Sequence, residues 1–219
     1  MIEDYQLIMK NDVWDAVPRP KRKSGVTSKW IYKIKHAADG SIEKYKAIFV
    51  ALGFSQKEGI NYEENFSPLA RYTSIKSVLA LAAVMKWKIH KMDVKAAFLN
   101  GVVEEEVYVE KPLGFETHDR ESHVRRLKKS LYGLKQTPRT WYNRIDSFLS
   151  SFGFTKSKAD SNLYYKVKDG NPVMFLLYVD DLFVTGMDGL IADTKRKLAA
   201  EFEMKYLGMM HYFLDMEVW

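Results

Sequence analysis

The feature that most constrains this chain is a continuous apolar run that ends on two aspartates. The run covers residues 173–179 and is typical of a strand buried on both faces. Asp180 and Asp181 follow directly, and the apolar sequence resumes at 182–184. Buried carboxylates are costly without a cation or several hydrogen-bond donors. Because neighbouring residues of a straight strand point to opposite faces, the two acids share a site only if the chain turns here. Such a hairpin would suit hard cations such as Mg²⁺.

A third acid, Asp93, lies in another strand-like segment, between residues 89–92 and Val94. If the strands that carry Asp93 and Asp180 are neighbours in one sheet, the two carboxylates converge although they are far apart in sequence. Two such acids can hold two metal ions about 3.5–4 Å apart, the arrangement used for in-line phosphoryl transfer. The spacing alone leaves three alternatives open: an acidic turn between strands, a two-metal nuclease, and an unrelated metal site.

The composition sets outer limits on function. The 219 residues, 47% of them hydrophobic, allow one large domain or two lobes with a sizeable core. A formal net charge of +6 favours an anionic partner. The absence of cysteine excludes disulfides, thiolate zinc sites and a cysteine nucleophile. No stretch is long and apolar enough to span a bilayer, and the first residues lack a secretory signal. We therefore expect a cytoplasmic protein that is not secreted and has no membrane partner.

Hydrophobic periodicity and turn residues predict an α+β fold. An Asp-Gly turn between strand patterns at 29–35 and 42–51 predicts a hairpin. Helical spacing at 74–86 predicts a helix with Ser74 as its cap. The elements predicted after it are a strand at 87–93, a helix that starts at 137–138 and ends at Gly153, strands at 163–168 and 173–178, a helix at 190–202 and a strand at 212–218. This β–α–β–β–α–β order is typical of an antiparallel sheet with two helices on one face.

Six sequence motifs, in the order of one known family, cover almost the whole chain. Residues 178–181, YVDD, are similar to the YxDD box of reverse transcriptases, and residues 91–101, KMDVKAAFLNG, to the copia-type motif around the first aspartate. The other four are NFSPLAR at 65–71, LYGLKQTPR at 131–139, ADSNLY at 159–164 and YFL at 212–214. The chain therefore resembles the reverse transcriptase segment of a copia-type LTR retrotransposon Pol polyprotein, of plant type.

The resemblance implies a right-hand polymerase fold. The fingers would comprise residues 1–86 with part of 102–136, and the palm, residues 87–219, would hold the β–α–β–β–α–β sheet. The chain leaves no residues for a thumb, ribonuclease H, protease or integrase, so we expect it to be truncated after the palm. The strand-like pattern that runs to its last residues indicates a piece of a longer polyprotein.

The resemblance also implies RNA-directed DNA polymerase activity. Asp93 and Asp180 would bridge two divalent ions, Mg²⁺ or Mn²⁺, with Asp181 in the same site and the backbone of Val94 as a further ligand. The primer 3′-hydroxyl would attack the α-phosphate of an incoming dNTP, while the metals stabilise the nucleophile and the leaving pyrophosphate. Lys205 would be the general acid that protonates the pyrophosphate.

Four further residues would contact the incoming nucleotide. In the family, an aromatic at the position of Phe98 blocks a 2′-hydroxyl and a glutamine at the position of Gln136 touches the nucleotide. Lys46 is a candidate for the triphosphate, and Tyr178 for a nucleotide contact. The alternatives are core packing for Phe98, a solvated turn residue for Gln136 and an exposed strand lysine for Lys46.

A basic segment would follow the template–primer phosphates, with contacts that depend strongly on salt. Its members are Arg125, Arg126, Lys128 and Lys129. The alternative is a solvated face. The implied partners are an RNA or DNA template–primer, dNTPs and the remaining Pol segments, in a virus-like particle in the ancestral element.

Three positions depart from the family's usual sequence. Where family members read YKARLVAKGF, residues 45–54 replace two basic residues by Ile48 and Leu52. Arg clamps phosphate oxygens with two hydrogen bonds at once, so its loss should weaken triphosphate binding. Near the primer grip, a usual Gly is Asp215, which cannot adopt every backbone geometry open to Gly. The alternative function is therefore a catalytically decayed retrotransposon fragment that folds and at most binds nucleic acid.

Overall fold

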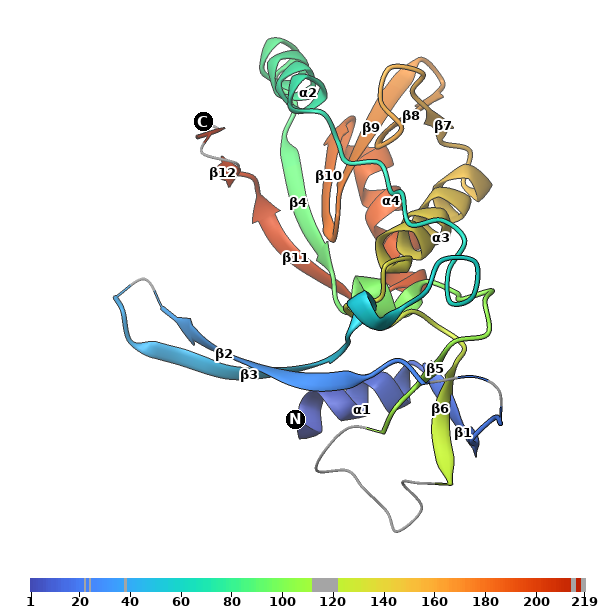
Figure 1. The fold of residues 1–219 in the computed structure, drawn as a ribbon. Coiled ribbons are helices and arrows are strands. Elements are labelled where there is room, and N and C mark those ends of the chain that lie inside the picture. The colour runs from blue at the N-terminus through green and yellow to red at the C-terminus, as the bar shows by residue number, and fades with distance from the viewer. Residues whose placement is uncertain (22, 24, 38, 112–121, 214–215, 218–219) are drawn as a thin grey trace. The chain divides into compact units, whose positions relative to one another are not determined.

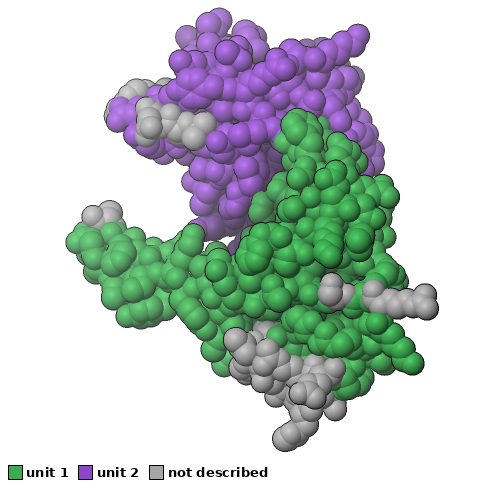
Figure 2. All heavy atoms as spheres, viewed as in Figure 1, with its two compact units in different colours: residues 1–67, 98–144 green, residues 68–97, 145–219 purple. Residues whose placement is uncertain are grey.

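The computed structural model describes the chain except for residues 22, 24, 38, 112–121, 214–215 and 218–219. The described residues form four α-helices and antiparallel sheets, which confirms a mixed fold of helices and antiparallel strands. They divide into two compact units, coloured separately in Figure 2. Unit 1 holds residues 1–67 and 98–144, and unit 2 holds residues 68–97 and 145–219. Among these residues, no helix is both long and apolar enough to cross a membrane.

Unit 1 contains a long two-stranded hairpin and a small three-stranded sheet (Figure 1). The hairpin pairs β2 (Ser28–His36) with β3 (Ile42–Ala51), as predicted. The three-stranded sheet has the order β1-β6-β5, with β1 at Trp14–Pro18, β5 at Tyr108–Val109 and β6 at His123–Leu127. Its helices are α1 (Ile2–Lys10), the 3-10 helix η1 (Gly53–Ser55), most of the 3-10 helix η2 (Ala97–Asn100) and the first half of α3 (Thr137–Ser151).

The core of unit 1 forms where the hairpin meets α1 and β1. Phe49, on β3, is fully buried, and its ring lies 5.7 Å from that of Trp14 and 5.3 Å from that of Trp30. The backbone N–H of Phe49 donates to Asp4 Oδ2 at 2.7 Å, which fixes α1 beside β3. The aromatic contacts and this hydrogen bond hold the base of the hairpin, whereas residues nearer its tip are exposed.

Unit 2 is built on a six-stranded antiparallel sheet of order β11-β4-β10-β9-β8-β7 (Figure 1). The strands are β4 (Ile89–Val94), β7 (Thr155–Lys156), β8 (Leu163–Lys168), β9 (Asn171–Tyr178), β10 (Asp181–Gly186) and β11 (Met204–Met209). The apolar run of β9 occupies a central position, with a strand on each side. A strand in this position buries both faces, which explains why its sequence does not alternate.

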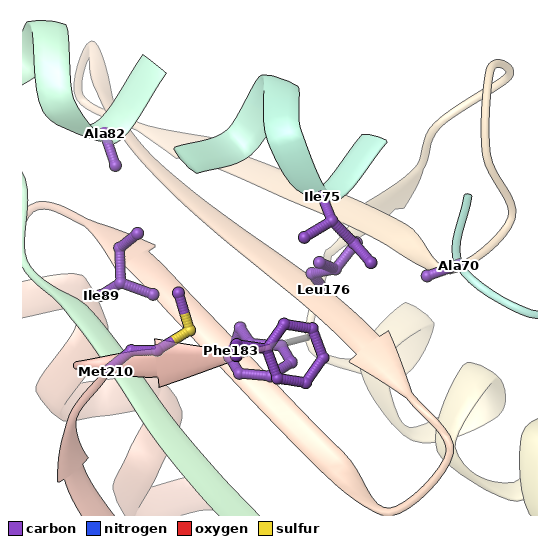
Figure 3. Close-up of a cluster of buried hydrophobic side chains, with 8 residues drawn as sticks. Ala70, Ile75, Ala82, Ile89, Leu176, Phe183 and Met210 are labelled. Carbon is purple, nitrogen blue, oxygen red and sulfur yellow. The ribbon is translucent and has the colours of Figure 1, made fainter. Parts of the chain in front are cut away.

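Helices cover both faces of the unit 2 sheet. On one face, α2 (Tyr72–Met85) packs on the strands, and in Figure 3 Ile75 of this helix points toward Leu176 of β9. On the other face, Tyr164 of β8 donates through its hydroxyl to Asp146 of α3 at 2.8 Å. The C-terminal end of α4 (Asp188–Glu201) lies beside α3, with the rings of Phe148 and Phe202 5.0 Å apart. Helices α3 and α4, the two helices of the predicted β–α–β–β–α–β order, thus share one face of the sheet. Helix α2 covers the opposite face.

The prediction for the last strand is wrong. The strand that pairs with β4 is β11, whereas residues 212–218, expected in that place, contain β12 (Tyr212–Phe213) and β13 (Met216–Glu217), which pair with each other. Five of the six residues of β11 are exposed, so this edge strand lacks the alternation that marks a half-buried strand. Asp215 lies outside the described residues.

The start of α2 also differs from the prediction, because its cap comes from a distant segment. The helix begins at Tyr72, and Ser74 lies inside it. The backbone N–H of Arg71 donates to Asp160 Oδ2 at 2.8 Å, and Ser74 also hydrogen-bonds to Asp160. Burial raises the pKa of Asp160, but these bonds and the backbone N–H of Asn162 outweigh it, so that the pKa lies below its ordinary value. Asp160 therefore supplies the carboxylate that caps α2.

We predict that Asp160→Asn lowers the free energy of unfolding by about 1–2 kcal/mol at neutral pH, the usual range for a lost cap. Because the folded-state pKa is depressed, this stabilisation is present above the unfolded-state pKa of about 4 and is lost as the pH falls through the folded-state value. Urea unfolding of both proteins as a function of pH measures the difference, which should shrink on acidification. A difference that is the same at pH 3 and pH 7 would contradict the role of the charge.

Candidate functional site

Two of the predicted acids lie directly opposite each other on neighbouring strands of unit 2. Asp93 of β4 pairs in register with Asp181 of β10, and Asp181 pairs with Tyr178 of β9. Residues paired in register project from the same face of a sheet, with Cβ atoms about 4.5–5.5 Å apart. The sheet therefore places Asp93 and Asp181 side by side on one face. The sequence pattern instead predicted Asp180 as the partner of Asp93, and Asp180 lies in the adjoining turn.

A tight turn carries the third acid. Val179 and Asp180 connect β9 to β10, and Val179 has a φ of +60°. A positive φ is a genuine outlier for a β-branched residue and is where a hairpin of this length normally has Gly. The backbone N–H of Val94 donates to the carbonyl oxygen of Asp180 at 3.1 Å. This bond ties the turn to the end of β4, next to Asp93.

The three acids crowd negative charge at the end of these strands. Burial raises the pKa of Asp93, and the charges of Asp180 and Asp181 raise it further, against the opposing effects of Lys205 and Lys91. Burial likewise raises the pKa of Asp181, with Lys91 acting against it and Asp180 with it. A carboxyl group with a raised pKa is destabilised in its charged form, so both groups would gain from a nearby cation.

Lys91 contributes a positive charge to this cluster. Its Nζ lies 3.1 Å from Asp181 Oδ2, and it sits over the rings of Phe183 and Phe213 at 5.7 Å and 5.3 Å. Lys91 was not among the predicted site residues. Its position two residues before Asp93 was the available signal, because residues i and i+2 of a strand share a face.

The donor set suits a hard divalent cation, which prefers carboxylate and carbonyl oxygens. Within the described part of the chain, however, no group of three or more His, Cys, Asp or Glu side chains lies close enough together to hold a metal ion. A metal site here would use the Asp93 and Asp181 carboxylates with Asp180 from the adjoining turn. The metal ligands therefore stay a prediction, supported by the charge of the cluster.

Two other predicted residues lie around the acids in unit 2. Tyr178 is half-buried, and its ring meets that of Phe213 edge-on at 5.4 Å. Lys205 of β11 is exposed and pairs in register with Asp93, whose pKa its charge lowers. The carboxylate of Asp93 thus has a lysine on the neighbouring edge strand, in a position compatible with the proposed general acid.

The remaining predicted nucleotide contacts belong to unit 1. Phe98, in η2, is half-buried and meets the ring of Tyr132 edge-on at 5.4 Å. Gln136 is only 1% exposed, and both ends of its amide are hydrogen-bonded within unit 1. It is therefore not a solvated turn residue. Lys46 is exposed on β3, directly opposite Lys33 of β2.

The predicted basic segment is partly neutralised. Lys128 Nζ lies 2.5 Å from Asp12 Oδ1 and 2.9 Å from Asp15 Oδ1. The guanidinium of Arg125 lies 5.9 Å from the ring of Trp14, and Arg126 pairs in register with Asp15. Asp15 on the neighbouring strand β1, and Asp12 just before that strand, thus compensate part of the positive charge that the sequence shows at 125–129.

Two of the three positions that depart from the resemblance, Ile48 and Leu52, lie among the described residues. Ile48 lies directly opposite Ile31 in the β2–β3 hairpin, so an apolar pair occupies this rung of the ladder. Leu52 precedes η1, and its backbone N–H donates to the carbonyl oxygen of Thr27 at 2.7 Å. Neither position presents a cation.

Comparison with known proteins gives a consistent assignment over most of the chain. A family described as reverse transcriptase (RNA-dependent DNA polymerase) matches residues 11–219. The retrovirus-related Pol polyprotein from transposon TNT 1-94 of Nicotiana tabacum is 43% identical over 220 residues, all of this chain and 17% of the polyprotein. The corresponding polyprotein from transposon RE1 of Arabidopsis thaliana is 40% identical over 94% of this chain and 14% of its own length. The transposon Ty1-GR3 Gag-Pol polyprotein of Saccharomyces cerevisiae is 28% identical over 93% of this chain and 11% of its own length.

We predict that Asp93→Asn raises the unfolding temperature when EDTA removes divalent ions. The pKa of Asp93 is raised in the folded state, so the stabilisation given by its proton is lost as the pH rises through that pKa. The asparagine side chain carries no charge at any pH, so Asp93→Asn does not lose this stabilisation at neutral pH. A gain of about 1 kcal/mol would correspond to roughly 2–4 °C in a chain of this size.

Mn²⁺ should raise the unfolding temperature of the native chain and leave that of Asp93→Asn nearly unchanged, because a ligand that binds the folded state stabilises it. Differential scanning fluorimetry measures both effects. Glu104→Gln, at an exposed position of unit 1, is the matched control for removal of one negative charge. Equal stabilisation of both proteins by Mn²⁺ would show that the ion binds elsewhere.

Proposed function

Since the chain belongs to the reverse transcriptase (RNA-dependent DNA polymerase) family, we propose that it is the catalytic core of a retrotransposon reverse transcriptase. The reaction proposed is nucleotidyl transfer from a dNTP to a primer 3′-hydroxyl on an RNA template. The observation that carries this proposal is the register pair Asp93–Asp181 beside the turn that bears Asp180. The chain spans 17% or less of the polyproteins named above, so the partners of the whole protein are also proposals: a template–primer and the other Pol segments, in a cytoplasmic virus-like particle.

In this proposal, Asp93, Asp180 and Asp181 would hold two Mg²⁺ or Mn²⁺ ions, with the backbone carbonyl of Val94 as a further ligand. The crowding of the carboxylates and the raised pKa values of Asp93 and Asp181 support it, because a cation would relieve both. When bound, the ions supply electrostatic stabilisation to the attacking hydroxyl and the leaving pyrophosphate. Lys205 donates a proton to the pyrophosphate from its place opposite Asp93.

The proposal assigns the unit 2 sheet to the palm of a right hand and the unit 1 hairpin to the fingers. Phe98 would exclude a 2′-hydroxyl from the sugar, with Tyr132 holding its ring. Gln136 and Tyr178 would contact the nucleotide, and Lys46 the triphosphate.

The basic residues of β6 and of the segment directly after it would meet the nucleic-acid backbone. Of its basic residues, we expect Arg125, Arg126 and Lys129 to contribute more than Lys128, because Lys128 is already paired with two acids.

We predict that the chain extends a DNA primer on an RNA template with dNTPs and Mg²⁺ or Mn²⁺. Asp180→Asn combined with Asp181→Asn should reduce extension to background, because both substitutions remove the charge that holds the ions. Gel analysis of a labelled primer measures this, with Glu104→Gln as the control for charge. Extension that survives the double substitution, or is absent from the native chain with either ion, would overturn the proposal.

A second candidate function is a folded fragment that has lost catalysis. The apolar pair Ile31–Ile48, in place of a cation in the hairpin, favours it.

We predict that Ile48→Arg with Leu52→Lys lowers the KM for dNTP about tenfold, the effect of about 1.4 kcal/mol of added binding. Steady-state primer extension measures the change. The matched control is Ile31→Arg, which adds a charge to the same rung from the opposite strand. A gain that Ile31→Arg reproduces would reflect general positive charge, and no gain would mean that the fingers do not limit this chain.

A further inference from the structure

Two glutamines that are 80 residues apart in sequence meet inside unit 1. Gln56 is 5% exposed and Gln136 is 1% exposed. Gln56 Nε2 donates to Gln136 Oε1 at 2.9 Å. A buried pair of uncharged amides adds little apolar area and must satisfy every polar atom, so it is costly unless the two groups fix each other's geometry.

The main chain fixes which way both amides point. The backbone N–H of Lys135 donates to Gln56 Oε1 at 2.8 Å, so Gln56 must present its NH₂ group to Gln136. Gln136 therefore accepts through Oε1, and its Nε2 donates to the carbonyl oxygen of Asn61 at 2.9 Å. A main-chain donor at one end and a main-chain acceptor at the other thus orient both side chains. An amide NH₂ has two N–H groups, so Gln136 keeps one donor beyond its bond to Asn61.

The two segments that carry the pair cannot easily separate. A Cβ at Gly53 would meet the carbonyl oxygen of Gly133 at 2.3 Å, and a Cβ at Gly133 would meet that of Ala51 at 2.1 Å. The backbone N–H of Ala51 donates to the carbonyl oxygen of Tyr132 at 2.8 Å. This close backbone approach needs glycine at both positions, and it holds the 53–62 turn against the segment that ends at Gln136.

We infer that Gln56 is a positioning residue, which holds the Gln136 amide so that its remaining N–H donates to an oxygen of the incoming dNTP. This inference rests on the proposed function, in which Gln136 contacts the nucleotide. Without the Gln56 donor, the Gln136 amide rotates and the orientation of its free N–H is no longer determined. Gln56 itself does not touch the substrate.

The first experiment tests the positioning without any need for catalysis. In ¹⁵N-labelled protein, the side-chain N–H of Gln136 that donates to Asn61 should be resolved and protected from solvent exchange, and Gln56→Met should abolish that protection. Gln56→Leu also removes the donor, so it should have the same effect and serves if Gln56→Met does not fold. Gln6→Met, at an exposed position of α1, is the matched control. Unchanged protection of Gln136 in both Gln56 variants would overturn the inference.

The second experiment tests whether Gln56 acts through Gln136. We expect Gln136→Ala and Gln56→Met each to raise the KM for dNTP about tenfold, the loss typical of one hydrogen bond, with little change in kcat or in the KM for template–primer. In a double-mutant cycle, Gln56→Met should add nothing in the Gln136→Ala background. Effects that multiply would show that Gln56 acts independently and would overturn the inference. A chain that protects Gln136 but never extends a primer would refute the polymerase proposal and leave the positioning intact.

Discussion

Repulsion between carboxylates at the ends of β4 and β10 is the constraint on which the rest of unit 2 depends. A buried antiparallel sheet does not normally place two acids directly opposite each other, because like charges in register destabilise the pair. Here Asp93 and Asp181 occupy such a pair, and Asp180 adds a third charge in the turn. The sheet compensates with lysines on the same face: Lys91 contacts Asp181, and Lys205 lies opposite Asp93 on the edge strand. Burial, and after it the neighbouring carboxylates, keeps the pKa values of Asp93 and Asp181 above the ordinary value despite these lysines, so a nearby cation would stabilise both charged forms.

Sequence patterns predicted the elements whose signals are local. The β2–β3 hairpin and the strands β8 and β9 were placed almost to the residue, because Gly at residues 40 and 170 marks their turns, each with a positive φ. Elements held by distant contacts were not predicted. The edge strand β11 lacks alternation because it is mostly exposed, and the cap of α2 comes from Asp160, 89 residues away in sequence. No window of sequence around Ser74 contains that information.

The same distinction applies to the candidate site. Two apolar strands that end on acids allowed the prediction that Asp93 meets an acid of the other strand, but the predicted partner was Asp180, whereas the register pairs Asp93 with Asp181. The burial of Gln136 and its bond to Gln56 depend on how two loops pack, and the neutralisation of Lys128 depends on acids of a neighbouring segment. The sequence therefore shows which residue types are present in a basic run or at a lone glutamine. Whether these side chains are available to a ligand is decided by the fold. For this reason, the contacts of Gln136 and Lys128 with the rest of unit 1 decide how each residue is interpreted.

The turn between β9 and β10 shows how strain and charge act on one short segment. Val179 adopts a left-handed conformation that costs an L-residue with a branched Cβ about 1–2 kcal/mol. That conformation closes the two-residue turn that carries Asp180, while Tyr178 and Asp181 remain paired. The cost is tolerated because the turn is fixed on both sides, by the ladder between β9 and β10 and by the bond from the Val94 N–H to the Asp180 carbonyl. A glycine at residue 179 would remove the strain but also the restriction on the backbone. Valine at this position therefore costs some folding free energy, but it restricts the backbone and so defines the position of Asp180 relative to Asp93. Two carboxylates can share one cation only if their relative position is defined in this way.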